Sequence, residues 1–213
     1  MSHVAVCMAT MAFMPAATSG NLGALCAQTV AGGRKLGVTD FTLHTQDMTY
    51  IPVSRESLAV KALDAGATHI LWLDHDMRFP TDAALRLLAR GQSYVGALYP
   101  RRGPPTLTTA YTMAHTPMKR GGTGLEKAVV MGLGVCLIGA EVFAAIPHPW
   151  FESGYREGKF RGEDENLCER ALAAGFQPYV DHDLSREVRH IAQVEYGYDD
   201  IIDDPEEVAH ATT

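Results

Sequence analysis

Residues 68–76 read Thr-His-Ile-Leu-Trp-Leu-Asp-His-Asp. The first six are rich in β-branched, aliphatic and aromatic side chains, which is the composition of a buried strand. Two carboxylates follow at once, and Pro80 prevents a simple continuation of the strand. The stretch therefore predicts a central strand over 68–73 with Asp74 and Asp76 at its carboxyl end.

Strands and helices alternate on both sides of this stretch. Short apolar runs predict further strands over 3–9, 41–45, 94–98, 129–138 and 178–180. Helices are predicted over 21–32, 55–65, 141–146 and 163–174, and also from the N-cap Thr81 to Arg90; Ser54 is the expected N-cap of the second. This alternation favours an α/β sandwich with a mostly parallel central sheet. Residues 1–194 are expected to form one domain, because no linker or internal repeat divides them.

The segment 99–125 predicts a long loop with room for at most a short hairpin. It is rich in proline and glycine and contains no acidic residue, whereas Arg101, Arg102, Lys119 and Arg120 lie within it. A loop of this length inside a compact domain is usually functional or disordered. We therefore expect its basic side chains to be able to approach an anionic ligand.

Composition and charge exclude several classes of protein. The chain has 213 residues, of which 46% are hydrophobic and 20% charged, and this composition excludes a disordered protein. Its net charge of −7 excludes a protein that is strongly basic as a whole and binds nucleic acid for that reason. All 18 Lys and Arg residues precede residue 195, and seven of the 25 acids follow residue 194, which predicts a solvated acidic tail over 195–213. No apolar run reaches the length of a membrane span, and the apolar start lacks the basic region of a signal peptide. A cytoplasmic protein is expected.

The four cysteines predict reduced thiols. Cys7, Cys26, Cys136 and Cys168 form no CxxC pair, and all but Cys26 lie in apolar surroundings. A zinc site is therefore not expected.

Asp74 and Asp76 are the strongest candidates for chemistry. Residues two apart on extended backbone face the same way, and the carboxyl edge of an open α/β sheet is where ligands bind. Two neighbouring carboxylates repel each other, and a Mg²⁺ or Mn²⁺ ion would relieve that repulsion. The alternative is a strand end with two solvated acids.

Three further patterns carry candidate residues. Glu163, Asp164 and Glu165 open a predicted helix, where acids either complement the helix dipole or, in one case, act as a general base. His190 follows the pair Asp181 and Asp183 and is either structural or part of a metal or phosphate site. Gly132 and Gly134 lie in a predicted strand and permit close approach by a ligand or another backbone, without the pattern of a dinucleotide-binding or P-loop motif.

Taken together, the chain over roughly 4–192 resembles glycosyltransferases of the GT-A fold, especially small phage and bacterial proteins similar to family 2. The order and spacing of seven segments carry this resemblance: 51–55, 65–80, 95–102, 132–138, 149–151, 162–164 and 179–183. One departure is Ser57, where many relatives have Asn.

The resemblance implies a nucleotide-sugar donor, most often a UDP-sugar, and a Mn²⁺ or Mg²⁺ ion. Asp74 and Asp76 fill the DxD motif: Asp76 would bind the metal, and Asp74 the metal or the ribose of the donor. His190 matches the histidine that completes the coordination, and Arg55 matches a basic residue near the nucleotide. Asp164 matches the catalytic base of inverting members, supported by Glu163. Gly132 and Gly134 would lie beside the donor sugar or the acceptor, and Arg101 and Arg102 would approach the phosphates.

Other functions remain open at this point. A nucleotidyltransferase or a metal-dependent phosphoesterase on a related sheet would use similar carboxylates, and a non-catalytic module could bind nucleotide-sugars without turnover. The acceptor is also open, since a glycan and a modified nucleic-acid base are both compatible with the basic loop.

Overall fold

The computed structural model describes residues 1–201 except 12, 48–49, 104–105, 157 and 193–194. Its centre is a sheet whose order is β2 (Val38–Asp47), β1 (Ser2–Thr10), β3 (His69–Leu73), β8 (Val135–Gly139), β5 (Tyr94–Gly96), β11 (Tyr179–Asp181), β7 (Leu125–Val130) and β6 (Tyr111–Thr112). The strands point mostly one way, with β8 and β7 reversed. The predicted α/β class is confirmed.

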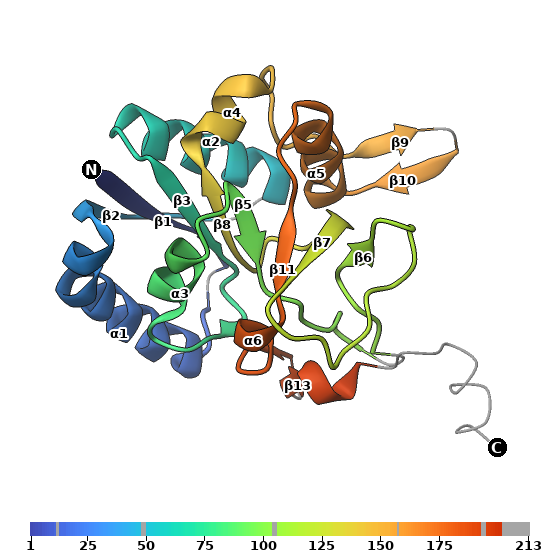
Figure 1. Cartoon of the computed structure of the whole chain (residues 1–213), viewed down its shortest axis with the longest axis horizontal. Helices are drawn as coiled ribbons and strands as arrows, with labels where there is room; N and C mark the ends of the chain where they lie inside the picture. Colours follow the sequence, from blue (N-terminus) through green and yellow to red (C-terminus); the bar gives the residue numbers. More distant parts are fainter. Residues whose placement is uncertain (12, 48–49, 104–105, 157, 193–194, 202–213) are drawn as a thin grey trace.

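Helices cover both faces of this sheet (Figure 1). One face packs against α1 (Ala16–Gly32) and α3 (Ala83–Ala89), and the other against α2 (Ile51–Asp64), α4 (Ala140–Ala145) and α5 (Glu163–Ala173). Strand β3 shows how the sequence builds two cores: Ile70 and Trp72 are buried on the side of α2, and Leu71 and Leu73 on the side of α1. Alternation along the strand thus fills both layers.

Several predicted boundaries were wrong for local reasons. Helix α1 begins at Ala16, not at residue 21, because Pro15 is tolerated just before the first turn. Helix α2 begins at Ile51 with Pro52 in its first turn, so Ser54 lies inside the helix and its buried hydroxyl caps nothing. Helix α3 follows Asp82, and the hydroxyl of Thr81 bonds to Gln28 instead of capping the helix.

The predicted strand 129–138 is two strands. Strand β7 ends at Val130 beside β11, and β8 begins at Val135 between β3 and β5. The residues between them, which include Gly132 and Gly134, carry the chain from one position in the sheet to the other. The long loop after Tyr99 is present as expected, with only the short strand β6 among its described residues.

Two small sheets were not predicted. Strands β9 (Gly154–Arg156) and β10 (Lys159–Arg161) form a hairpin that projects beside α5 (Figure 1). Strands β13 (Glu195–Gly197), β12 (Arg189–Ile191) and β4 (Met77–Arg78) form a three-stranded sheet. In the chain between β10 and β12, the short helix α6 (His182–Ser185) follows β11 directly. The second small sheet joins the end of the described chain to the loop after β3.

The expected acidic tail begins within the fold. Residues 195–200 form β13 and the turn η2 (Tyr198–Asp200), and Tyr198 and Ile201 are buried in the hydrophobic core. Residues 202–213 lie outside the described residues. Among the described helices, counting η1 (Gly33–Leu36) as well, none combines the length and apolar character that a membrane span requires.

Candidate active site

The candidate residues gather at the carboxyl edge of the central sheet. Strands β1, β3 and β5 run parallel there, and the segments that follow them line a cavity of about 370 Å³. Its wall contains Asp74 and Asp76 after β3, Arg101 and Arg102 after β5, and Arg55 from the first turns of α2. This is the edge at which open α/β sheets bind their ligands.

Arg55 joins two of the predicted acids. Its Nη2 donates to Oδ1 of Asp74 at 2.8 Å and its Nη1 donates to Oε1 of Glu163 at 2.6 Å, while only 7% of its side chain is exposed. The two carboxylates come from β3 and α5, so the buried guanidinium ties these elements together. Arg55 therefore holds Asp74 in the wall of the cavity through one carboxylate oxygen, which leaves the second oxygen of Asp74 for other contacts.

Burial and charge act against each other in this group. Burial disfavours the charged form of Arg55, but Asp74, Glu163 and Asp164 outweigh it and raise the pKa of the guanidinium. Burial raises the pKa of Glu163 and of Asp164, and the charge of Arg55 only partly opposes this. Asp164 also accepts a hydrogen bond from the backbone N–H of Glu165 at 2.8 Å. Among the residues that the structure describes, no donor binds its second oxygen, and a carboxylate with a raised pKa and such an oxygen is suited to accept a proton.

Asp76 and His190 form a second pair. Oδ2 of Asp76 lies 3.5 Å from Nε2 of His190, and their side chains are 10% and 13% exposed. The contact depends on the small sheet: His190 in β12 pairs with Met77 in β4, and the backbone N–H of Ile191 donates to the carbonyl of Asp76 at 2.7 Å. Antiparallel pairing thus brings the late histidine to the DxD segment.

The environment of His190 fixes which ring nitrogen faces Asp76. Its Nδ1 lies 2.9 Å from the carbonyl of Pro100, which can only accept, so Nδ1 must carry a proton. In the neutral ring Nε2 then presents a lone pair toward Asp76, the orientation that a metal-ligating histidine needs. The ring of Tyr99 contacts His190 edge-on, with centroids 5.6 Å apart, and restrains it further.

The two partners shift each other's pKa. Burial opposes ionisation of Asp76, but the hydrogen bond and charge of His190, with smaller contributions from His75 and Arg102, lower the pKa of the carboxyl. Burial favours neutral His190, but Asp76 and the Pro100 carbonyl outweigh it and raise the pKa of the imidazole. Asp76 is thus ionised at neutral pH. Its negative charge favours either a protonated His190 or a cation bound between Asp76 and a neutral His190.

The donor set fits a metal ion only in part. Within the described residues, no group of three or more His, Cys, Asp or Glu side chains is arranged to hold a metal. Asp76 and His190 supply two ligands, and the Oδ1 atom of Asp74, expected as a third, is occupied by Arg55. Mg²⁺ and similar ions are often held by one or two protein ligands together with substrate phosphates and water, so two ligands are enough for a site completed by a diphosphate.

Arg101 and Arg102 face the same cavity. Nη1 of Arg102 lies 3.2 Å from Oδ2 of Asp76, and Arg101 lines the wall without a polar partner for its side chain among the described residues. Arg102 occupies the side of Asp76 that a cation would take, and its long side chain is 58% exposed, so it can turn from the carboxylate to a phosphate.

Gly132 and Gly134 make room for the side chain of Tyr99 and do not line the cavity. A side chain at either position would meet Tyr99; at Gly134 a Cβ atom would lie 2.7 Å from the Tyr99 hydroxyl and 3.1 Å from Oδ2 of Asp74. The N–H of Gly134 donates to the Tyr99 hydroxyl at 2.8 Å. Neither glycine lines this cavity or the larger cavity that adjoins it. Their absent side chains leave room for Tyr99 and for the carboxylate of Asp74.

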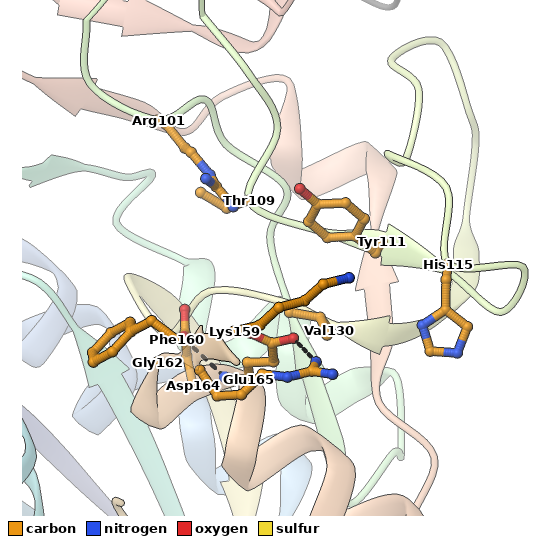
Figure 2. Close-up of a pocket in the computed structure, with 11 residues that line it drawn as sticks. Arg101, Thr109, Tyr111, His115, Val130, Lys159, Phe160, Gly162, Asp164 and Glu165 are labelled. Atoms are coloured by element: carbon orange, nitrogen blue, oxygen red, sulfur yellow. Dashed lines mark hydrogen bonds and ion pairs between the residues drawn. The ribbon is translucent and has the colours of Figure 1, made fainter. Parts of the chain in front are cut away.

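A larger cavity of about 700 Å³ adjoins the first (Figure 2). The two share Arg101 and Thr109 in their walls. Asp164 lies at the floor of the larger one, at the start of α5, and the hairpin strand β10 contributes Lys159 and Phe160. The acid expected to act as a base therefore faces a space that borders the one beside Asp76.

Sequence reasoning missed several residues of these walls. Tyr99 lies in the segment 95–102, but the sequence assigns it no role. Its burial between Gly132, Gly134 and His190 depends on residues far away in the chain. Lys159 and Phe160 were missed because the hairpin was not predicted; a glycine at 158 between two short runs of aromatic and basic residues was the available signal.

Comparisons with known proteins bear on the fold. No family model matches the chain, and a search of curated proteins finds no match. Among solved structures, A197 from STIV superposes with a TM-score of 0.60 at 14% identity, over 96% of this chain and 95% of that one. The structure of GalNAc-T7 with UDP, GalNAc and Mn²⁺ superposes with a TM-score of 0.56 at 11% identity, over 90% of this chain and 44% of that one. The chain thus spans less than half of GalNAc-T7, and at these identities the likeness establishes one property: the chain has a GT-A-like α/β fold.

Proposed function

We propose that this chain is a metal-dependent glycosyltransferase that moves a sugar from a nucleotide-sugar to an acceptor hydroxyl. One observation carries the proposal: Asp76 and His190 face one cavity together with Arg101 and Arg102, and Asp164 faces the cavity that adjoins it. A cation-binding, phosphate-accepting space beside a space with a carboxylate base is what a transfer between two substrates requires.

The first cavity is the proposed donor site. A diphosphate there would complete a Mn²⁺ or Mg²⁺ ion held by Asp76 and His190, and Arg101 and Arg102 would bind its remaining oxygens. When bound, the ion would supply charge neutralisation for the departing diphosphate. UDP is the first nucleotide to test, because the similar structure of GalNAc-T7 contains UDP and Mn²⁺.

The second cavity is the proposed acceptor site. The oxygen of an acceptor hydroxyl bonds to the anomeric carbon of the donor sugar, and the bond from that carbon to the diphosphate breaks. The hydroxyl proton passes to Asp164, and the nucleoside diphosphate leaves with the bonding electrons. Glu163 does not line this space; it binds Arg55, which in turn holds Asp74. The acceptor hydroxyl belongs to a glycan or to a modified nucleic-acid base.

The decisive experiment measures UDP-linked stabilisation together with the products of turnover. The full chain is heated with UDP in the presence and absence of Mn²⁺, and a ligand at a hundred times its Kd is expected to stabilise it by about 2.7 kcal/mol. Asp76→Asn should abolish the Mn²⁺-dependent part. Asp82→Asn, a matched change at a half-exposed carboxylate outside the cavity, should leave it unchanged.

Product analysis separates the alternatives. Incubation with UDP-sugars should release UDP together with free or transferred sugar. Release of UMP and sugar phosphate would instead identify a phosphoesterase. Release of sugar phosphate with transfer of the UMP group to added pyrophosphate, forming UTP, would identify a nucleotidyltransferase. Stabilisation by UDP without any turnover would favour a binding module and contradict the proposal.

A further inference from the structure

The walls of the larger cavity differ in charge from its floor. Arg101 and Lys159 line its sides, and among the described residues neither side chain has a carboxylate partner. Of the two acids at the floor, Glu165 is paired with Arg161, which also bonds to Glu169 at 2.9 Å. Because Arg161 is shared between Glu165 and Glu169, it offsets their charge only in part and the floor is acidic, whereas Arg101 and Lys159 place positive charge at the sides.

The two cations come from separate parts of the chain. Arg101 belongs to the loop after β5, and Lys159 begins β10 in the projecting hairpin. Figure 2 shows Arg101 reaching into the cavity from one side and Lys159 from the other, with Asp164 and Glu165 below Lys159. Two unpaired cations that converge on one space from different elements favour an anionic ligand there.

His115 adds a third nitrogen donor at the rim. Its backbone has a φ of 58°, in the left-handed region that is uncommon for residues other than glycine, and its N–H donates to the carbonyl of Thr112 at 2.8 Å. This tight turn presents the imidazole to the cavity from the side opposite Phe160 (Figure 2).

Aromatic rings supply a surface of another kind. Phe160 lines the cavity and is 59% exposed, and Tyr155, its cross-strand neighbour in β9, is 78% exposed. The two rings meet edge-on at 5.5 Å, which holds the ring of Phe160 in place. Tyr111 offers a second ring in the same cavity. Large exposed aromatic side chains grouped beside a cavity mark a binding surface for a ligand with an apolar face.

From this placement we infer that the acceptor is an anionic sugar: its ring rests on Phe160, its phosphate or carboxylate group binds Arg101 and Lys159, and one of its hydroxyls lies at Asp164. A cavity of about 700 Å³ has the size of a small-molecule site and accommodates one or two sugar units. This inference rests on the proposed function for the role of Asp164, but the recognition of an anionic sugar is tested separately.

The first experiment compares ligands that differ in charge. Binding to the full chain is measured by calorimetry for methyl glucoside, glucose 6-phosphate, glucuronic acid and inorganic phosphate. The phosphorylated or the carboxylated sugar should bind about tenfold more tightly than methyl glucoside, because hydrogen bonds to charged groups are the stronger ones. The stronger of the two identifies which anionic group the acceptor carries. Equal affinity for the neutral and both anionic sugars, or equal affinity for inorganic phosphate and the sugar phosphate, would overturn the inference.

The second experiment assigns the contacts to residues. Lys159→Met should weaken binding of the anionic sugar about tenfold and leave methyl glucoside unchanged, whereas Phe160→Ala should weaken both sugars alike. Lys35→Met removes the same charge from η1, outside both cavities, and should change neither. A loss of equal size from Lys159→Met and Lys35→Met would mean that only net charge acts, and would contradict the inference.

Failure of the two proposals can be told apart. UDP with Mn²⁺ is measured on the same Lys159→Met protein, and its stabilisation should match that of the unmodified chain. If UDP with Mn²⁺ stabilises neither protein while the anionic sugar still binds, the transferase proposal fails and the anionic sugar site stands. If UDP binds and the anionic sugar does not, the sugar site fails alone.

Discussion

The guanidinium of Arg55 donates through Nη2 to Oδ1 of Asp74 at 2.8 Å, inside the protein rather than on its surface. The same group bonds to Glu163 through its other nitrogen, so one buried cation fixes carboxylates from two distant elements. The first acid of the DxD segment is therefore held in place by the fold, while the second, Asp76, remains available to the cavity.

Removing Arg55 should destabilise the protein severely. Arg55→Met leaves the largely buried carboxylate of Glu163 and one oxygen of Asp74 without their partner, and breaking a buried ion pair in this way costs about 3–5 kcal/mol. Urea unfolding measures the loss. Arg86→Met, which removes ion pairs with half-exposed acids, should cost at most about 1 kcal/mol. Similar small losses in both variants would contradict a structural role for Arg55.

Asp164→Asn should separate activity from stability. Transfer should fall at least about 100-fold, the usual contribution of a general base. Because burial raises the pKa of Asp164, its ionised form is disfavoured in the folded chain, and Asn should increase the free energy of unfolding at pH 7. The acceptor oxygen for the N–H of Glu165 is retained in the variant.

The pH dependence of stability gives the sign of the Asp164 effect. A carboxyl whose pKa is raised by folding binds its proton more tightly in the folded chain, so its contribution to stability is greatest at low pH. That contribution declines as the pH rises from the ordinary value of 3.8 through the raised pKa, and is constant above it. The difference between Asp164→Asn and the unmodified chain should therefore grow over this window. Parallel urea profiles between pH 4 and pH 7 would be inconsistent with a raised pKa.

Two glycine substitutions should have opposite effects. Gly134→Ala places a methyl group 2.7 Å from the Tyr99 hydroxyl and 3.1 Å from Oδ2 of Asp74, and overpacking of this kind costs about 1–3 kcal/mol. Gly23→Ala, in α1 with nothing within 4 Å of the new group, should stabilise by about 0.5–1 kcal/mol. Thermal unfolding of both variants checks the prediction, and a stabilised Gly134→Ala would show that Tyr99 can move aside freely.

The thiols should differ sharply in reactivity. Burial raises the pKa of all four thiols, that of Cys7 and of Cys168 to about 12, but Cys26 is partly exposed whereas the other three are buried. The thiolate is the reactive form, so titration with a disulfide reagent at pH 8 should modify Cys26 readily and the other three only after unfolding. Rapid reaction of a second thiol in the folded protein would contradict this arrangement. All four cysteines are free, as the sequence predicts.

Local patterns predicted the parts of the fold that depend on local chemistry. The composition of residues 68–73 is sufficient to predict β3, and the acids after it follow from their place in the sequence. Tertiary relations were not predictable in this way. Nothing near Val135 signals that β8 inserts between β3 and β5, because strand neighbours are chosen by long-range packing.

The candidate site shows the same division. Asp164 and Asp76 stood out as acids at the start of a helix and the end of a strand, and the structure places both at cavities. The hydrogen bond of Arg55 to Glu163 joins residues far apart in sequence. The close packing of Tyr99 against Gly132 and Gly134 likewise depends on tertiary structure, because the chain passes there from β7 to β8. Sequence patterns indicate which residues are candidates for a site but do not predict which of them are in contact.

The pairing of β4 with β12 sets an order for the maturation of the site during synthesis. Asp76 leaves the ribosome with the first half of the sheet, while His190, its partner, belongs to one of the last strands described. Because a domain generally folds as a unit, Asp76 waits for β12 before its contact with His190 can form. A nascent chain therefore cannot form its proposed cation-binding pair before residue 190 has been synthesised, and termination before that residue yields protein without the pair.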